Sequence, residues 1–251
     1  MAAAYDTYDY PSYWLDREYE HKSEEFAIKT LLLDIPKIKT VLEVGAGYGR
    51  LTPSYAFRSK KIILSDPSAK LLSLARKTFV DDKRIKYLHL SLDKLPSKIS
   101  RESIDLVIMV RVIHHIEDIP EAFKIINRCL KPNAYFILEY ANKSHLKAVF
   151  EQLLKGDPTF LLDIFPREVG KITRKKKCLP FKNYHPDDIS HELSISGFDI
   201  IKKLSVSNIR SSTLKKILSV DVCLSLEKAL QKPLSYLNIG PSIFLLCRKR
   251  G

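Results

Sequence analysis

The segment at residues 40–50 (TVLEVGAGYGR) constrains the fold of this chain more than any other. Its first five residues are mostly apolar or β-branched, which predicts a buried strand over 40–44. Gly45, Gly47 and Gly49 follow on alternate positions, where the absence of a Cβ lets a ligand approach the backbone closely. A buried strand that opens into a glycine-rich turn predicts a nucleotide-type cofactor site.

Strand-like and helix-like segments alternate through the first 140 residues. Apolar strands are predicted at 40–44, 61–65, 85–90, 104–110 and 134–140, and helices at 51–58, 68–79 and 120–130. Beyond them we expect a helix at 187–196, a strand at 198–206, a basic amphipathic region at 213–230 and a last strand at 242–247. Strands that are apolar on both faces and alternate with helices indicate a mostly parallel sheet covered on both sides. Near the N-terminus, Ser12 and Ser23 are candidate caps of two helices.

Length and composition fit one α/β domain with a sizeable core. The chain has 251 residues, of which 45% are hydrophobic and 28% charged, values typical of a soluble globular protein. No apolar run reaches the roughly 20 residues of a membrane helix, and the first residues lack the pattern of a secretory signal. Four scattered cysteines show no metal-ligand spacing and are expected to be reduced. We therefore expect a cytoplasmic protein that needs no metal.

The acidic residue after the second predicted strand indicates the kind of cofactor. Asp66 stands 66 − 45 = 21 positions after Gly45, a spacing at which a carboxylate can accept hydrogen bonds from both hydroxyls of a ribose. The alternative role of Asp66 is that of a helix cap. A nicotinamide dinucleotide site requires a small residue where this chain has Arg50. An NAD-dependent oxidoreductase therefore ranks third among the candidate functions.

Further motifs follow in an order that can be compared with known families. Glu43 precedes the three glycines, LDKLP occupies 92–96, VIHHIED occupies 112–118 and RCLKP occupies 128–132. Together with Asp66, these motifs resemble those of the class I S-adenosylmethionine-dependent methyltransferases, and specifically the small-molecule group (methyltransferase type 11-like). The resemblance covers about residues 10–140 and, more loosely, the C-terminal hairpin. The chain departs from the pattern at Ser91, where an acidic residue is usual, and at 133–134, where two glycines are usual.

The resemblance implies a fold, a cofactor and a domain organisation. The fold is a Rossmann-like, doubly wound, mostly parallel seven-stranded sheet with an antiparallel C-terminal strand, N-terminal helices and a C-terminal helical insertion. The cofactor is S-adenosyl-L-methionine. Residues 1–35 are expected to form an N-terminal helical cap and residues 36–251 the methyltransferase domain. Insertions at about 143–185 and 207–240 are expected to form a lid on the acceptor side.

The resemblance also implies roles for individual residues. Glu43 would lie beneath the amino-acid part of the cofactor, Asp66 would hold the ribose, and Leu92 or Asp93 would contact the adenine. Arg17, in an aromatic segment that folds over the cofactor, would pair with its carboxylate. The expected cofactor-binding residues are Tyr13, Arg17, Glu43, Gly45, Ala46, Gly47, Gly49, Asp66, Pro67, Leu92, Asp93, Val110 and Arg111. For Arg111, cofactor, acceptor and solvent all remain open as neighbours.

The acceptor and any general base are less constrained by the sequence. His115 is a candidate general base, against the alternative that it only packs, and a tyrosine of the N-terminal segment is another candidate. The net charge of +13 suits either an anionic small substrate or a polyanionic partner. The basic run at 171–177 fits a solvated loop better than an RNA groove, because few aromatic residues accompany it.

We expect methyl transfer to a small-molecule or lipid-like acceptor, with tRNA or rRNA methylation as the alternative. A non-catalytic protein that keeps the cofactor fold is a further alternative. The acceptor, the atom methylated and the oligomeric state do not follow from the sequence.

Overall fold

A seven-stranded sheet with the strand order β3-β2-β1-β4-β5-β9-β8 forms the centre of the computed structural model, which describes residues 9–169 and 181–251. Strands β1 to β5 pair in parallel, and β9 runs antiparallel to both of its neighbours, β5 and β8. The predicted doubly wound sheet with an antiparallel C-terminal strand is thus confirmed. The strands are β1 (Thr40–Val44), β2 (Lys61–Asp66), β3 (Ile85–His89), β4 (Ile104–Met109), β5 (Leu130–Ala141), β8 (Phe198–Val206) and β9 (Ser242–Lys249).

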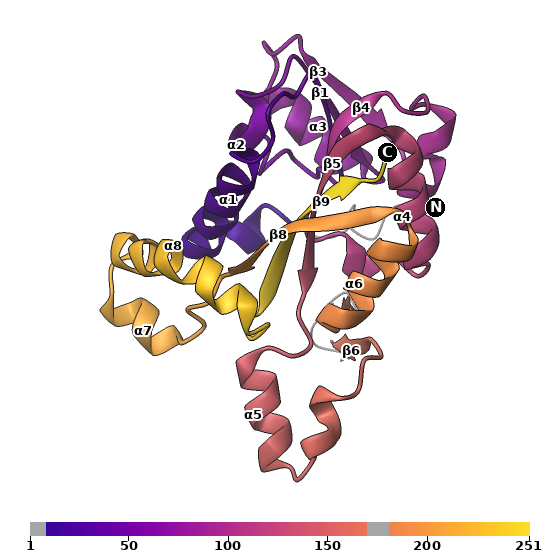
Figure 1. Cartoon of the computed structure of the whole chain (residues 1–251). Coiled ribbons are helices and arrows are strands. Elements are labelled where there is room, and N and C mark those ends of the chain that lie inside the picture. Colours follow the sequence, from indigo (N-terminus) through magenta and orange to yellow (C-terminus); the bar gives the residue numbers. More distant parts are fainter. Residues whose placement is uncertain (1–8, 170–180) are drawn as a thin grey trace.

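Helices cover both faces of the sheet, with α1 and α2 on one side and α4 and α6 on the other (Figure 1). The α-helices are α1 (Glu18–Leu32), α2 (Pro53–Ala56), α3 (Ala69–Thr78), α4 (Ile119–Cys129), α5 (Leu146–Leu154), α6 (Pro186–Ile195), α7 (Ser212–Ile217) and α8 (Val220–Tyr236). Short 3-10 turns are η2 (Ser12–Trp14), η3 (Leu92–Ser97), η4 (Ile113–His115) and η5 (Pro158–Leu161), and β6 (Arg167–Val169) pairs with β7 (Phe181–Asn183) in a small second sheet. None of the helices in the described ranges combines the length and the apolar composition needed to cross a bilayer.

Alternating side chains of the central strands enter two separate cores. Leu42 of β1 packs in the core on the α4 side, whereas its neighbour Val41 packs with Ile28 and Leu31 of α1 on the other side. Because both faces are buried, polar side chains of these strands collect where the strands end. The carboxyl ends of β1, β2, β4 and β5 all lie at one edge of the sheet, which is where ligands bind in open α/β folds.

Local capping explains where several helices begin. The Ser68 hydroxyl accepts a hydrogen bond from the Leu71 N–H (3.1 Å) at the start of α3, and Asp118 accepts one from Glu121 N–H (2.9 Å) at the start of α4. The prediction that Ser23 caps a helix is wrong. The helix already begins at Glu18, and the Ser23 hydroxyl donates to the carbonyl of Tyr19 inside it (2.7 Å). Acidic residues in the first turn favour this earlier start.

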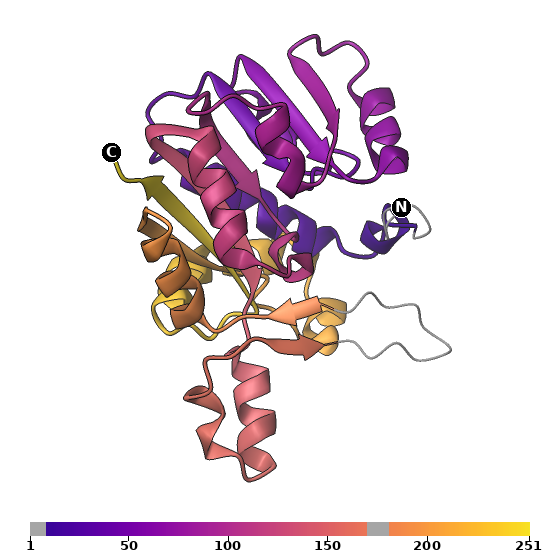
Figure 2. The same ribbon diagram turned by 90° about the vertical axis from the view of Figure 1, so that its right-hand side faces the viewer.

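Both predicted insertions contain the elements that depart from the strand–helix alternation. The segment after β5 holds a hairpin of α5 and η5, which extends away from the sheet in both views (Figure 1, Figure 2). The segment after β8 holds α7 and α8, and α8 packs against α1 and β8. The basic run at 171–177 lies outside the described residues, and the division into a cap and a main domain stays a prediction.

Candidate functional site

The three glycines after β1 all have a positive φ but have different neighbours. Their φ angles are +69°, +56° and +78° for Gly45, Gly47 and Gly49, a region that residues with a Cβ rarely adopt. A Cβ on Gly45 would lie 2.2 Å from a methyl of Val112, and one on Gly49 would lie 2.5 Å from the ring of Phe79. A Cβ on Gly47 would meet no heavy atom closer than 3.7 Å. Close packing therefore explains two of the glycines, and the absence of a close contact at Gly47 fits a ligand held against the backbone.

Asp66, at the end of β2, is hydrogen-bonded to the same turn. One carboxylate oxygen accepts from the Gly47 N–H (2.8 Å) and the other from the Ser68 N–H (2.7 Å). The side chain that caps α3 is that of Ser68, not Asp66. Asp66 thus fixes the glycine turn against the start of α3, at the position where the family resemblance expects a ribose.

Glu43 lies beneath the turn and contacts protein groups. Its Oε2 accepts hydrogen bonds from the hydroxyls of Tyr55 (2.5 Å) and Thr52 (3.0 Å). Burial raises the pKa of Glu43 to about 7, although both hydrogen bonds act in the opposite direction. The residue ties β1 to the start of α2, which immediately follows the glycine turn.

Two arginines share one buried carboxylate at the edge of this turn. Glu24 of α1 is fully buried and pairs with Arg50 (2.5 Å) and with Arg111 (2.7 Å to its Nε). The ring of Trp14 lies against both guanidinium groups, with centroid distances of 3.4 Å to Arg50 and 4.8 Å to Arg111. Burial alone would raise the pKa of Glu24, but the two arginines hold it below its usual value. We call these four residues the Glu24 cluster; it holds the N-terminal segment against the glycine turn.

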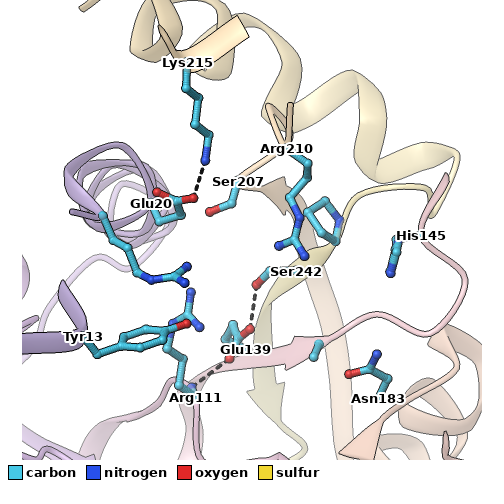
Figure 3. A pocket seen from close by; sticks show the side chains of 13 residues that line it. Tyr13, Glu20, Arg111, Glu139, His145, Asn183, Ser207, Arg210, Lys215 and Ser242 are labelled. Carbon is cyan, nitrogen blue, oxygen red and sulfur yellow. Dashed lines mark hydrogen bonds and ion pairs between the residues drawn. The ribbon is translucent and has the colours of Figure 1, made fainter. Parts of the chain in front are cut away.

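A cavity of about 460 Å³ lies beside Arg111 (Figure 3). The N-terminal segment, the ends of β4 and β5, the start of β9 and both insertions contribute to its wall. Its lining residues are Tyr13, Arg17, Glu20, Arg111, Glu139, Ala141, His145, Asn183, Ser207, Arg210, Lys215, Pro241 and Ser242. The cavity therefore lies where parallel strands end and where the two insertions meet.

Glu139 and Arg111 meet at the floor of the cavity. Arg111 has a φ of +58°, a conformation that costs free energy in a residue other than glycine. Its N–H donates to one oxygen of Glu139 (2.7 Å), and the Ser242 hydroxyl donates to the other (2.6 Å). Burial raises the pKa of Glu139 even though Arg111 opposes the shift. The floor thus carries a buried carboxyl group with a raised affinity for a proton.

His145 provides a different kind of polar group. Its Nδ1 accepts the N–H of Ala148 (3.2 Å) and so caps α5. Burial lowers the pKa of His145, which favours the neutral ring. Because Nδ1 is an acceptor in this bond, the neutral ring carries its proton on Nε2 and can act there as a donor.

The residues expected from sequence fall into separate places. Tyr13, Arg17 and Arg111 line the cavity, whereas Glu43 and Asp66 lie at the glycine turn. His115 is exposed and is not among the residues that line the cavity. Ala46 and Val110 are buried, Pro67 and Asp93 lie at the ends of β2 and at η3, and Leu92 packs on the core. Their contacts with a cofactor stay predictions.

Other residues of the site were missed. Glu139 had a signal, because it stands near the end of the last parallel strand, as Glu43 and Asp66 stand in theirs. Glu24 and Arg210 had no such signal, because the residues around them in the structure lie far away in the sequence.

A glycine turn at a strand end, held by a buried Asp66 and with no close neighbour at the Cβ position of Gly47, defines a class of protein. Such a site at the carboxyl edge of a doubly wound sheet belongs to α/β proteins that bind a nucleoside-containing cofactor. Among the described residues, no three histidine, cysteine or acidic side chains are placed to hold a metal ion together.

Comparison with known sequences identifies the family. The family described as a methyltransferase domain matches residues 42–138. An uncharacterized methyltransferase of Schizosaccharomyces pombe is 33% identical over 199 residues, which cover 74% of this chain and 73% of that protein. A ubiquinone biosynthesis O-methyltransferase of Hydrogenovibrio crunogenus is 27% identical over 146 residues, or 55% of this chain; the match spans only 61% of that relative.

Solved structures share the fold at low identity. An S-adenosylmethionine-dependent methyltransferase from Mesorhizobium loti has a TM-score of 0.60 at 17% identity, covering 90% of this chain and 98% of that one. The N-methyltransferase NodS of Bradyrhizobium japonicum, solved with S-adenosyl-L-homocysteine, has a TM-score of 0.62 at 12% identity, covering 98% and 95%. The chain belongs to the class I S-adenosylmethionine-dependent methyltransferases.

Proposed function

We propose that the protein transfers the methyl group of S-adenosylmethionine to a small-molecule acceptor bound in the cavity beside Arg111. The observation that carries this proposal is the cavity itself. Its volume of about 460 Å³ is in the range of small-molecule sites, and it adjoins the strand ends near the glycine turn. The Hydrogenovibrio relative, whose name refers to ubiquinone biosynthesis, supports a small or lipid-like acceptor. The cytoplasmic location stays a prediction from the sequence.

The residues at the glycine turn fit the cofactor. The backbone at Gly47 and the carboxylate of Asp66 would hold its nucleoside part, and the residues from Leu92 onward would approach its adenine. The sulfonium of the cofactor makes the methyl group electrophilic. The protein's task is then to orient the acceptor in line with that methyl group and to exclude water. Trp14 packs on Arg50 and Arg111 in the Glu24 cluster. This contact supports the proposal that the N-terminal segment covers the bound cofactor.

If the acceptor must lose a proton, Glu139 is the better candidate base. It lines the cavity, and burial raises its pKa, which makes its carboxylate a stronger proton acceptor. His115 does not line the cavity, and the Nδ1 of His145 is engaged in capping α5. We therefore assign the base to Glu139.

Calorimetric titration with S-adenosylmethionine and S-adenosylhomocysteine tests the cofactor part of the proposal. We expect binding in the micromolar range, weakened about tenfold or more by Asp66→Ala, a loss of about 1.4 kcal/mol. The matched control is Asp81→Ala, because Asp81 is an exposed aspartate away from the turn. Absence of heat at submillimolar cofactor would contradict the proposal.

Binding to bulk RNA at two salt concentrations tests the acceptor class. The net charge of +13 is the observation that favours RNA. A protein that contacts many phosphates loses about 10³-fold or more in affinity between about 50 and about 200 mM salt. We expect weak binding without such a slope. Tight, strongly salt-dependent binding would favour RNA as the acceptor. A protein that binds the cofactor but methylates no molecule in a mixture of candidate acceptors would instead be a non-catalytic protein that keeps the cofactor fold.

A further inference from the structure

Two arginines of the cavity have no carboxylate partner within the described ranges. Arg17 precedes α1 and lies over the ring of Tyr13, 4.1 Å from its centroid. Arg210 lies between β8 and α7, and its guanidinium points into the cavity in Figure 3. No ion pair joins either of them to a residue that the structure describes, although both line the cavity. The cavity thus presents two guanidinium groups that form no ion pair with an acidic side chain of residues 9–169 or 181–251.

The acidic side chains nearby are already engaged. Glu20 pairs with Lys215, and Glu24 pairs with both Arg50 and Arg111. Glu139 has a raised pKa, because burial disfavours its charged form. Positive charge is therefore in excess among the groups that line the cavity, which favours a negatively charged ligand.

Arg210 is itself affected by this excess. The surrounding protein removes water from its guanidinium, and this is the main reason why the pKa of Arg210 is lowered. Glu20 opposes the shift, but Arg111 and Arg17 both lower the pKa further. The three arginines are thus near enough to repel one another, and a bound anion would relieve the repulsion.

The backbone that leads to Arg210 is held in place. Glu227 of α8 is fully buried and accepts hydrogen bonds from the N–H groups of Ser207 (2.7 Å) and Asn208 (3.0 Å). The Tyr19 hydroxyl donates to Glu227 (2.6 Å) and accepts from the Ile209 N–H (3.0 Å). The three residues before Arg210 are therefore fixed to α1 and α8. A cation on such a support is preorganised for binding.

We propose that Arg210, together with Arg17, forms a subsite that binds a carboxylate or phosphate group of the methyl acceptor. The forked donors of a guanidinium match both groups, since each offers two oxygens side by side. The Nε2–H of His145 and the side chain of Asn183, elsewhere on the wall, can bind further polar atoms of the acceptor. This inference rests on the proposed function and narrows the acceptor to a small anionic molecule.

The anion at Arg17 has two possible sources, because the family resemblance also assigns Arg17 to the carboxylate of the cofactor. The experiment must therefore separate the cofactor from the acceptor. Protein saturated with S-adenosylhomocysteine is titrated in a calorimeter with glutarate, citrate or inorganic phosphate, and glutaramide serves as the uncharged probe. The variants are Arg210→Gln and Arg17→Gln. The matched control is Lys216→Gln, which removes the same charge from an exposed position of α7 next to Lys215.

We expect the wild type to bind at least one of the three anions at millimolar concentration and not to bind glutaramide. Arg210→Gln should weaken that binding about tenfold or more and leave the affinity for S-adenosylhomocysteine within about twofold. Lys216→Gln should change neither affinity by more than about twofold.

Unchanged anion binding in Arg210→Gln would overturn the subsite, as would a wild type that binds none of the three anions at tens of millimolar. An equal loss of cofactor affinity in Arg210→Gln would assign Arg210 to the cofactor instead. If Arg17→Gln lowers only the cofactor affinity, Arg17 is excluded from the acceptor subsite. Failure of the proposed function itself is recognised separately, because the wild type would then not bind S-adenosylhomocysteine.

Discussion

Gly45 and Gly47 stand two positions apart, yet a methyl group added to each should have different effects. Gly45→Ala forces Val112 to move, because the new Cβ would lie 2.2 Å from its methyl, and we expect a stability loss of about 2 to 3 kcal/mol. The methyl group of Gly47→Ala makes only an ordinary contact, 3.7 Å from Leu71, so that only its φ of +56° costs stability, about 1 kcal/mol. It should instead weaken S-adenosylhomocysteine binding about tenfold or more. Urea unfolding and calorimetry measure both quantities. Equal losses of affinity for S-adenosylhomocysteine in the two variants would contradict the assignment of a packing role to Gly45 and a binding role to Gly47.

Glu43 should make stability depend on pH. Burial raises its pKa from 4.5 to about 7, so between these values the folded protein holds a proton that the unfolded chain has released. The free energy of unfolding should therefore fall as pH rises through this range, by up to about 3 kcal/mol from this group. Arg50 opposes the shift in pKa and Asp66 adds to it.

Glu43→Gln isolates the effect of this carboxyl group, because an amide oxygen can still accept from Tyr55 and Thr52. Urea unfolding of both proteins at about pH 5 and about pH 8 should show a smaller decrease for the variant. Identical decreases would mean that the folded protein does not hold the proton on Glu43.

At the scale of whole elements, Glu24 connects helix α1 to the glycine turn and to the end of β4. Glu24→Gln should cost about 3 kcal/mol, because it leaves two largely buried arginines without their carboxylate. The neighbouring Glu25→Gln is the control. Glu25 is partly exposed and lies 4.0 Å from Lys29, so less than about 1 kcal/mol should be lost. Chemical denaturation of both variants measures the difference, and similar losses would show that Arg50 and Arg111 do not depend on Glu24.

The elements were more predictable than the contacts between them. The strands at 40–44 and 198–206 were predicted with their observed bounds, and that at 61–65 within one residue, because their apolar runs are a local property of the chain. The start of α1 was missed, since Ser23 fits a cap pattern but lies inside the helix. A pattern at one serine does not show that the preceding turn is already helical.

At the scale of the whole molecule, cofactor binding should stabilise the entire fold. A ligand present at about 100 times its dissociation constant adds about 2.7 kcal/mol to stability. For a chain of this length that corresponds to a rise in Tm of about 5 to 10 °C. We expect this rise with S-adenosylhomocysteine in the wild type and a much smaller one in Asp66→Ala at the same concentration. Differential scanning calorimetry gives the comparison, and a full rise in the variant would exclude Asp66 from the cofactor site.

The glycine turn and Asp66 could be predicted because they occur within 22 residues of each other in one strand–helix–strand unit. The cavity could not. Arg17 and Arg210 both line the cavity, but Arg17 precedes α1 and Arg210 follows β8. The packing of α1 against α8 and β8 brings their segments to the same wall. Motifs that are local in sequence thus indicate the methyl donor, whereas the proposed acceptor site depends on long-range packing.

The contacts of Gly45 with Val112 and of Gly49 with Phe79 affect how this motif can be used in distant relatives. Both glycines would be retained in a descendant that had lost its cofactor, because a Cβ on either would displace a packed side chain. Gly47 has no such packing constraint and would be free to drift to asparagine or aspartate, which tolerate its φ. When genomes are searched for active members of the family, the middle glycine is therefore the more informative of the three.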